Sequence, residues 1–112
     1  MASHRTARNA EDIKRELSDL MRSLKDPRIT GLLSIVKLEL TNDYSHCTVY
    51  VSAMEGLDAA KQAVEGLRSA SGFIRREIGA RLRMRRTPEF HFIPDDGIEH
   101  SADIGKILRG LQ

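Results

Sequence analysis

The apolar residues of this chain change their spacing several times, and the order of those changes restricts the fold more than any other feature of the sequence. The first group has helical spacing and consists of Ile13, Leu17, Leu20, Met21 and Leu24. Such a group lies along one side of a helix, so it predicts an amphipathic helix that buries one face. Because the proline of Asp26-Pro27 disfavours helical geometry in the residue before it, residues 25–31 are expected to form a loop.

Two stretches with a period of two come next. In the first, polar residues alternate with Val36, Leu38 and Leu40, and in the second they alternate with Cys47, Val49 and Val51. This alternation is typical of strands with one apolar and one solvated face. The turn-forming residues TNDYS (41–45) separate the two stretches, which predicts a hairpin whose listed apolar residues face the core.

Two helices and a third strand are predicted in the second half of the chain. Helical spacing returns at Ala60, Ala63, Val64 and Leu67, and again at Ile74, Ile78 and Leu82. Only residues 69–72 separate these two groups, so the helices from about 57–69 and onward from 72 should meet at a kink. Thr87-Pro88 then breaks helical geometry, and Phe90 and Phe92 are expected in a short strand on either side of His91.

The predicted order is helix, strand, strand, helix, kinked helix, strand, and a last short helix between Ile104 and Leu111. This order favours an α+β fold of two layers, with the helices on one face of a three-stranded sheet. The 112 residues suffice for a single domain, 1–112, whose core needs neither a metal nor a disulfide. With one cysteine, and no apolar stretch suited to a secretory signal or a membrane span, the chain is expected in the cytoplasm.

Basic charge is concentrated between residues 69 and 86. This segment holds six arginines and a single acid, Glu77, whereas the chain totals are 18 basic and 16 acidic residues, which leaves 12 basic and 15 acidic residues elsewhere. A one-sided cluster attracts a polyanion, so it favours a nucleic acid as partner. The alternative is a solvated helix face whose arginines serve solubility alone.

On a helical wheel, Arg75, Arg76, Gly79 and Arg83 fall on one cationic arc beside the apolar stripe. Gly79 either lets a phosphate backbone approach the helix or permits close packing, and the sequence favours neither. Gly72 is expected to need a positive φ at the turn, and the helix start at Ser71-Gly72 presents unpaired N–H groups that suit a phosphate.

Residues for catalysis or metal binding do not form a recognisable pattern. His4, His46, His91 and His100 are scattered over different elements without metal-ligand spacing, and Cys47 is expected in the core. Asp95-Asp96 is interpreted as a turn and helix cap, and no phosphate-cradling glycine loop is present. The sequence therefore predicts no metal, no cofactor and no enzymatic activity.

Four segments in order, DPRI, VKLELTNDYSHCTVYVS, ASGFIRREIGARLRMRRTPEFHF and DDGIEHSADI, resemble ribosome-binding factor A over nearly the whole chain. The resemblance implies a K-homology type II fold in which an Ala-x-Gly turn, here Ala70-Ser71-Gly72, replaces Gly-x-x-Gly. It also implies a non-enzymatic assembly factor that binds the small ribosomal subunit and its ribosomal RNA, promotes late RNA processing and supports adaptation to cold shock.

The RNA-binding residues expected from the turn, the arginines and this resemblance are Ala70, Ser71, Gly72, Arg75, Arg76, Gly79, Arg83 and Arg86. With few aromatic residues, recognition should depend on the shape of the RNA backbone more than on base sequence. A monomer without membrane contact is expected. Three alternatives are a K-homology-like module that binds other RNA outside the ribosome, a small phosphatase with an arginine loop, and a protein–protein adaptor.

Overall fold

The computed structural model describes residues 2–29 and 31–95, with side chains from residue 9 onward. Its elements in chain order are α1 (Ala2–Ser23), β1 (Leu33–Leu40), β2 (His46–Ala53), α2 (Leu57–Ser69), α3 (Ser71–Leu82) and β3 (Glu89–Pro94). All six are elements that the apolar spacing predicts. The last predicted helix, between Ile104 and Leu111, lies outside the described residues.

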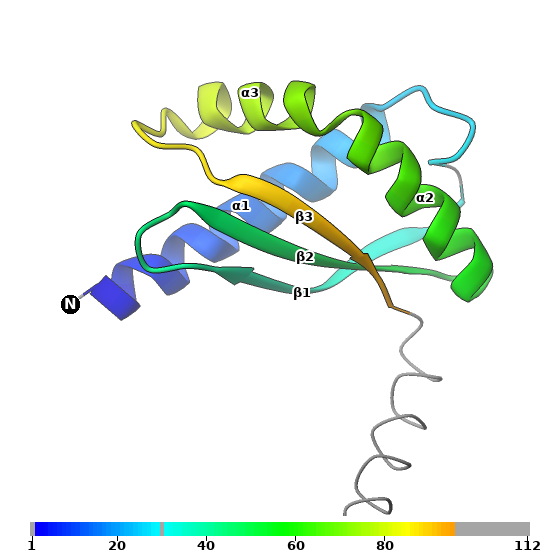
Figure 1. Cartoon of the computed structure of the whole chain (residues 1–112), viewed down its shortest axis with the longest axis horizontal. Helices are drawn as coiled ribbons and strands as arrows, with labels where there is room; N and C mark the ends of the chain where they lie inside the picture. The colour runs from blue at the N-terminus through cyan, green and yellow to red at the C-terminus, as the bar shows by residue number, and fades with distance from the viewer. Residues whose placement is uncertain (1, 30, 96–112) are drawn as a thin grey trace, which may run out of the picture.

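The three strands form one mixed sheet in the order β1-β2-β3 (Figure 1). β1 and β2 form the predicted antiparallel hairpin, whereas β2 and β3 run parallel because α2 and α3 carry the chain back across the sheet. This α+β arrangement, with helices on one face and a kinked helix pair between β2 and β3, is the K-homology type II-like fold that the sequence predicts.

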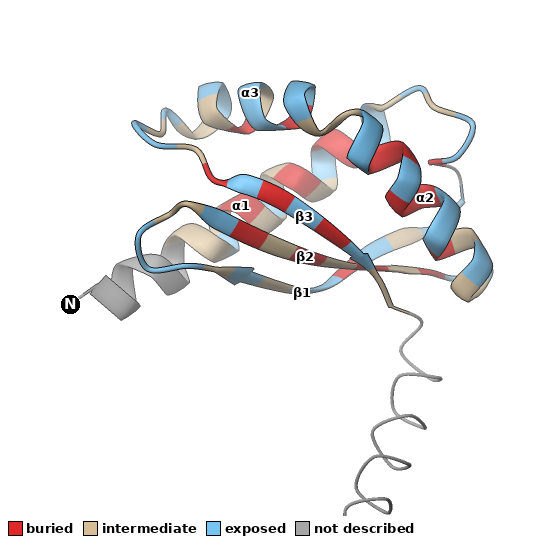
Figure 2. Cartoon of the chain, in the orientation of Figure 1, coloured by how far each residue is buried: buried red, intermediate tan, exposed pale blue. Residues whose placement is uncertain are grey.

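Alternating burial along β2 indicates which face the helices cover (Figure 2). Cys47, Val49 and Val51 are fully buried against the helices, whereas Thr48 and Tyr50 between them are only partly buried. α2 packs against β2 and β3, and its alanines at 60 and 63 have no exposed surface, so short side chains let the helix lie close to the sheet. The opposite face of the sheet, called here the open face, is not covered by the described helices.

β1 departs from the predicted alternation at one position. Ile35 pairs with Val51 and Lys37 pairs with Tyr50, so Val36 is an extra residue in a β-bulge. Ile35 is buried and Val36 is 46% exposed. A bulge moves the following side chains to the other face, which explains why Leu38 and Leu40, rather than Lys37 and Glu39, pack against the core beside Ile35. The expectation that Val36 faces the core is therefore wrong, and Leu38 and Leu40 are partly buried.

A single residue, Ala70, joins α2 to α3 and produces the predicted kink. Its φ of −94° and ψ of 8° lie outside the helical region. The Ala70 N–H donates to the carbonyls of Gly66 and Leu67, both at 3.1 Å, and its own carbonyl accepts the N–H of Ile74 at 2.9 Å. Ala70 thus ends one helix and begins the next without leaving its backbone groups unpaired.

The β1–β2 turn is organised around the carboxylate of Asp43. One carboxylate oxygen accepts hydrogen bonds from Thr41 Oγ1 at 2.8 Å, the Ser45 N–H at 3.1 Å and Ser45 Oγ at 2.6 Å. These donors, chiefly the Ser45 hydroxyl, lower the pKa of Asp43 from 3.8 to about 2. Because the folded-state pKa is depressed, the ionised carboxylate stabilises the turn at neutral pH, and this contribution is lost as the pH falls through about 2.

Replacing Ser45 with alanine should therefore raise the pKa of Asp43 toward its ordinary value, because the strongest donor to the carboxylate is removed. An NMR titration of the Asp43 carboxyl group measures this shift directly. Ser34→Ala, which removes an exposed hydroxyl from β1, is the matched control and should leave the Asp43 titration unchanged. An unaltered midpoint in Ser45→Ala would contradict the assignment of the hydrogen bonds.

Candidate nucleic-acid interface

Most of the predicted RNA-binding residues line two adjacent hollows. The first, called the Gly72 hollow, is shallow and open, and it is lined by Gly72, Arg75, Arg76, Gly79, Met84 and Thr87. The second, the Arg83 hollow, is lined by Asn9, Asp12, Tyr44, Leu82, Arg83, Met84, Arg85 and Arg86. Met84 borders both, so the two hollows form one continuous surface along α3 and the loop that follows it.

The remaining two predicted residues lie apart from these hollows. Ala70 is the junction residue between the helices. Ser71 instead lines a separate depression beside the edge strand β3, together with Arg68 and Phe90. Arg68 Nη2 donates to the Phe92 carbonyl at 2.8 Å, so part of the exposed backbone edge of β3 already has a partner within the chain.

Arg83 does not continue the cationic arc of α3, because the helix ends at Leu82. Arg83 has left-handed dihedrals, φ 51° and ψ 47°. Its N–H donates to the Ala80 carbonyl at 3.4 Å and the Met84 N–H donates to the Gly79 carbonyl at 3.0 Å, which is the Schellman pattern of a helix C-terminus. The helical-wheel position predicted for Arg83 is therefore wrong, and the turn brings this residue to the Arg83 hollow.

The arginines of the two hollows differ in whether their side chains have partners within the chain. Arg75 donates from Nε and Nη2 to the Thr87 carbonyl at 3.2 and 3.0 Å, which ties α3 to the loop before β3. Among the described residues, neither Arg76 nor Arg83 has an ion pair or hydrogen bond from its side chain. Both side chains are exposed, so their guanidinium groups keep all their donors for a ligand.

Gly72 does not have the positive φ that the sequence suggests. Positive φ values occur instead at Gly31 and Gly56 among the described glycines, and Gly72 lies in the first turn of α3. A Cβ added there would meet only Arg76 Nη1, at 3.6 Å. The glycine therefore keeps the helix start open beside an arginine, where backbone N–H groups and the positive end of the helix dipole favour an anion.

Gly79 allows α3 to pack closely against Thr87 in the loop before β3. A Cβ at this position would lie 2.5 Å from Thr87 Oγ1, nearer than real atoms approach. Of the two alternatives that the sequence leaves open, the geometry favours packing of α3 against the loop. Because Arg75 binds the carbonyl of the same threonine, this contact also positions one of the arginines.

Gly79→Ala should consequently destabilise the fold by roughly 1–3 kcal/mol, because the added methyl group overlaps the Thr87 side chain. In a Thr87→Ala background the overlap disappears, since the next side-chain atom is Thr87 Cβ at 3.6 Å, and alanine should then favour the helix by about 1 kcal/mol over glycine. Urea denaturation of the two single variants and the double variant tests this. Equal effects of Gly79→Ala in both backgrounds would contradict the packing role.

Arg81 is not available to a ligand in the same way as its neighbours. Its guanidinium pairs with Asp19 at 3.0 Å and Glu16 at 3.5 Å on α1, and with Glu77 at 3.6 Å on α3. The hydrogen bond to Asp19 is the main cause that raises the pKa of Arg81. One of the six clustered arginines therefore joins two helices, and acids distant in sequence reduce the local excess of positive charge.

Phe73 is a candidate RNA-binding residue that the clustered arginines do not indicate. Its side chain is 44% exposed at the start of α3, directly after Gly72. The signal is present in the sequence, because Phe73 stands off the stripe formed by Ile74 and Ile78. An exposed aromatic ring beside arginines provides a surface on which an unpaired base can stack.

Cys47 is a core residue, as predicted. Its side chain has no exposed surface, and burial raises the pKa of the thiol to about 12, so it stays protonated and is a poor nucleophile or metal ligand. Within residues 2–29 and 31–95, no helix has the length and hydropathy to cross a membrane.

Comparison with known proteins identifies the family. Residues 5–108 match the family model described as ribosome-binding factor A. The chain is 48% identical to ribosome-binding factor A of Acetivibrio thermocellus over 93% of this chain and 85% of that protein. It is 44% identical to the Desulfitobacterium hafniense protein of the same name over 100% of this chain and 90% of that protein.

A crystal structure and a fitted homology model share the fold. The crystal structure of ribosome-binding factor A from Thermus thermophilus matches with a TM-score of 0.70 and 31% identity, over 80% of this chain and 93% of that one. A homology model of the Thermus thermophilus factor, fitted into a cryo-EM map of a 30S complex with that factor, matches with a TM-score of 0.64 and 32% identity, over 76% and 89% of the two chains. The chain belongs to the ribosome-binding factor A family.

Proposed function

We propose that this protein binds the small ribosomal subunit through its ribosomal RNA and acts in a late stage of subunit assembly. The observation that carries the proposal is the surface formed by the Gly72 and Arg83 hollows. Exposed arginines line this surface from the open start of α3 to the loop after it, and among the described residues Arg76 and Arg83 have no side-chain partner, whereas Arg86 donates to the Asp43 carbonyl at 3.5 Å. A relative with this fold was fitted into a map of a 30S complex, which supports the same kind of partner here.

Each part of this surface has a distinct proposed role. Gly72 leaves space for a phosphate at the N-terminus of α3, and Arg76 lies beside it. Arg83 and Arg86 would contact phosphates further along the backbone of the RNA. Arg75, held on the Thr87 carbonyl, keeps the loop in place while its exposed guanidinium still faces the hollow.

The proposed surface recognises the shape of the RNA backbone and makes one stacking contact with a base. Among the described residues outside the core, Phe73 offers an aromatic ring next to the helix start. The proposal therefore places a phosphate at Gly72 and an unpaired base on Phe73. This would favour a bent or single-stranded RNA segment over a regular duplex.

Binding is the proposed mechanism, without a chemical step. A protein that binds an immature RNA conformation more tightly than another shifts the equilibrium by that difference in affinity. In this way a monomer, acting as a single domain over residues 1–112 in the cytoplasm, would promote ribosomal RNA processing and support growth after cold shock.

Co-sedimentation with ribosomal subunits tests the proposal. The tagged protein should migrate with small subunits, more strongly with immature than with mature particles, and crosslinking in cells should recover small-subunit ribosomal RNA. A module for other RNA would stay in the light fractions and crosslink elsewhere. An adaptor would remain bound after nuclease treatment and at high salt, and either result would overturn the proposal.

A further inference from the structure

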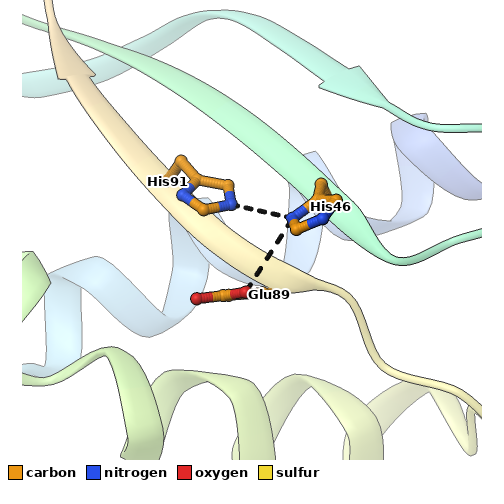
Figure 3. A group of neighbouring side chains, drawn as sticks. All are labelled: His46, Glu89 and His91. Atoms are coloured by element: carbon orange, nitrogen blue, oxygen red, sulfur yellow. Dashed lines mark hydrogen bonds and ion pairs between the residues drawn. The ribbon is translucent and has the colours of Figure 1, made fainter.

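The parallel pairing of β2 with β3 brings two histidines together that are 45 residues apart in the sequence. His46 is opposite Glu89 and Thr48 is opposite His91 in the register of the two strands. The residues next to them, Cys47, Phe90 and Phe92, are buried against the helices. The side chains of His46, Glu89 and His91 therefore lie on the open face of the sheet, away from the helices (Figure 3).

The potential ligand atoms of these three residues converge. His46 Nδ1 lies 3.0 Å from His91 Nε2 and 3.8 Å from Glu89 Oε2 (Figure 3). One ligand atom from each residue falls within 4.8 Å of the other two. Two imidazole nitrogens at hydrogen-bond distance share one proton, so one ring donates and the other accepts.

We propose that His46, Glu89 and His91 form a binding site for a divalent transition metal ion, with Zn²⁺ as the best fit. Two imidazoles and one carboxylate are a ligand set that Zn²⁺ takes at about 2.0–2.2 Å, with water in the remaining position. Ligand atoms of a tetrahedral zinc site lie roughly 3.4 Å apart, between the two separations observed here. Small rotations of exposed side chains bring all three to that distance, and the ion replaces the shared proton.

The site depends on the fold, because its ligands come from two strands that are adjacent only after the crossover through α2 and α3. β3 is an edge strand of six residues. An ion held by both strands adds a link between β2 and this edge. Since the unfolded chain does not hold the three ligands together, binding should stabilise the folded state.

A titration of the full, untagged chain with Zn²⁺ tests the site, with Co²⁺ as a spectroscopic probe because four-coordinate Co²⁺ absorbs visible light. The expected result is one equivalent bound and a rise in the melting temperature on addition of Zn²⁺. His46→Ala and His91→Ala should each abolish both effects, and Glu89→Gln should weaken binding, because a neutral amide oxygen is a poorer ligand for Zn²⁺ than a carboxylate. These side chains are exposed, so circular dichroism of the variants should match that of the unmodified protein.

The matched control removes the other two histidines, His4 and His100, in a double alanine variant. This variant should bind Zn²⁺ with unchanged affinity and stoichiometry. The proposal is overturned if the unmodified protein binds no Zn²⁺, if His46→Ala and His91→Ala bind as well as it does, or if the His4/His100 variant loses binding. Paramagnetic broadening by Ni²⁺ should be confined to NMR signals near residues 46, 89 and 91, and broadening centred elsewhere also overturns it.

Discussion

Replacing Phe92 with alanine should lower the free energy of unfolding by about 3–5 kcal/mol, the usual cost of removing a buried phenylalanine side chain. The side chain is 1% exposed. Phe92 pairs with Val49 in the parallel register and stacks with Phe90 at a centroid distance of 6.2 Å. The loss is large because the side chain anchors an edge strand to the core. It is a substantial fraction of the stability of a domain of this size, which is about 5–15 kcal/mol in total.

Ile93 provides the control for this experiment, because it is the next residue of β3 but its side chain is 36% exposed on the open face. Ile93→Ala should cost about 1 kcal/mol or less, since surface substitutions usually have small effects. Guanidinium denaturation measures both variants, and the midpoint should shift far more for Phe92→Ala. Similar shifts for the two variants would mean that β3 does not contribute its alternate residues to the core.

The apolar spacing of the sequence predicts the fold well wherever one period continues through an element. Cys47, Val49 and Val51 keep strict alternation and are all buried as predicted. The prediction that Val36 faces the core is wrong because a bulge inserts an extra residue between Ile35 and Lys37. The position of a bulge depends on the partner strand as well as on the local sequence. The only mark in β1 itself is the adjacent apolar pair Ile35-Val36, where the apolar positions change from odd to even, and the pair does not show which of its two residues is buried.

The candidate site is harder to predict because its properties depend on contacts between distant segments. Sequence identifies the cluster of arginines, but the partners of Arg81 include two acids on α1. The close contact of Gly79 with Thr87 likewise depends on where the loop before β3 returns to α3. The proximity of His46 and His91 follows from a parallel register, which no local spacing encodes.

Loss of two free arginines is expected to have the largest effect on binding to small subunits. Arg76→Ala and Arg83→Gly should be combined in one variant, because both side chains are exposed and glycine adopts the left-handed conformation of residue 83 without strain. If each contacts a phosphate, the pair should weaken binding by about tenfold to a hundredfold. The slope of log affinity against log salt should become less negative by about 1.4–1.8.

Arg15 and Arg22 supply the charge-matched control, since both are exposed arginines on α1 whose ion pairs are made within that helix. Their double alanine variant has the same net charge as the first variant, so a general electrostatic effect would change both salt slopes equally. A contact-based interface changes only the first. If the Arg76/Arg83 variant binds with unchanged affinity and slope, the arginines are a solvated surface. If its affinity falls at an unchanged slope, they support the structure of the loop rather than contact phosphates, because only lost phosphate contacts reduce counterion release.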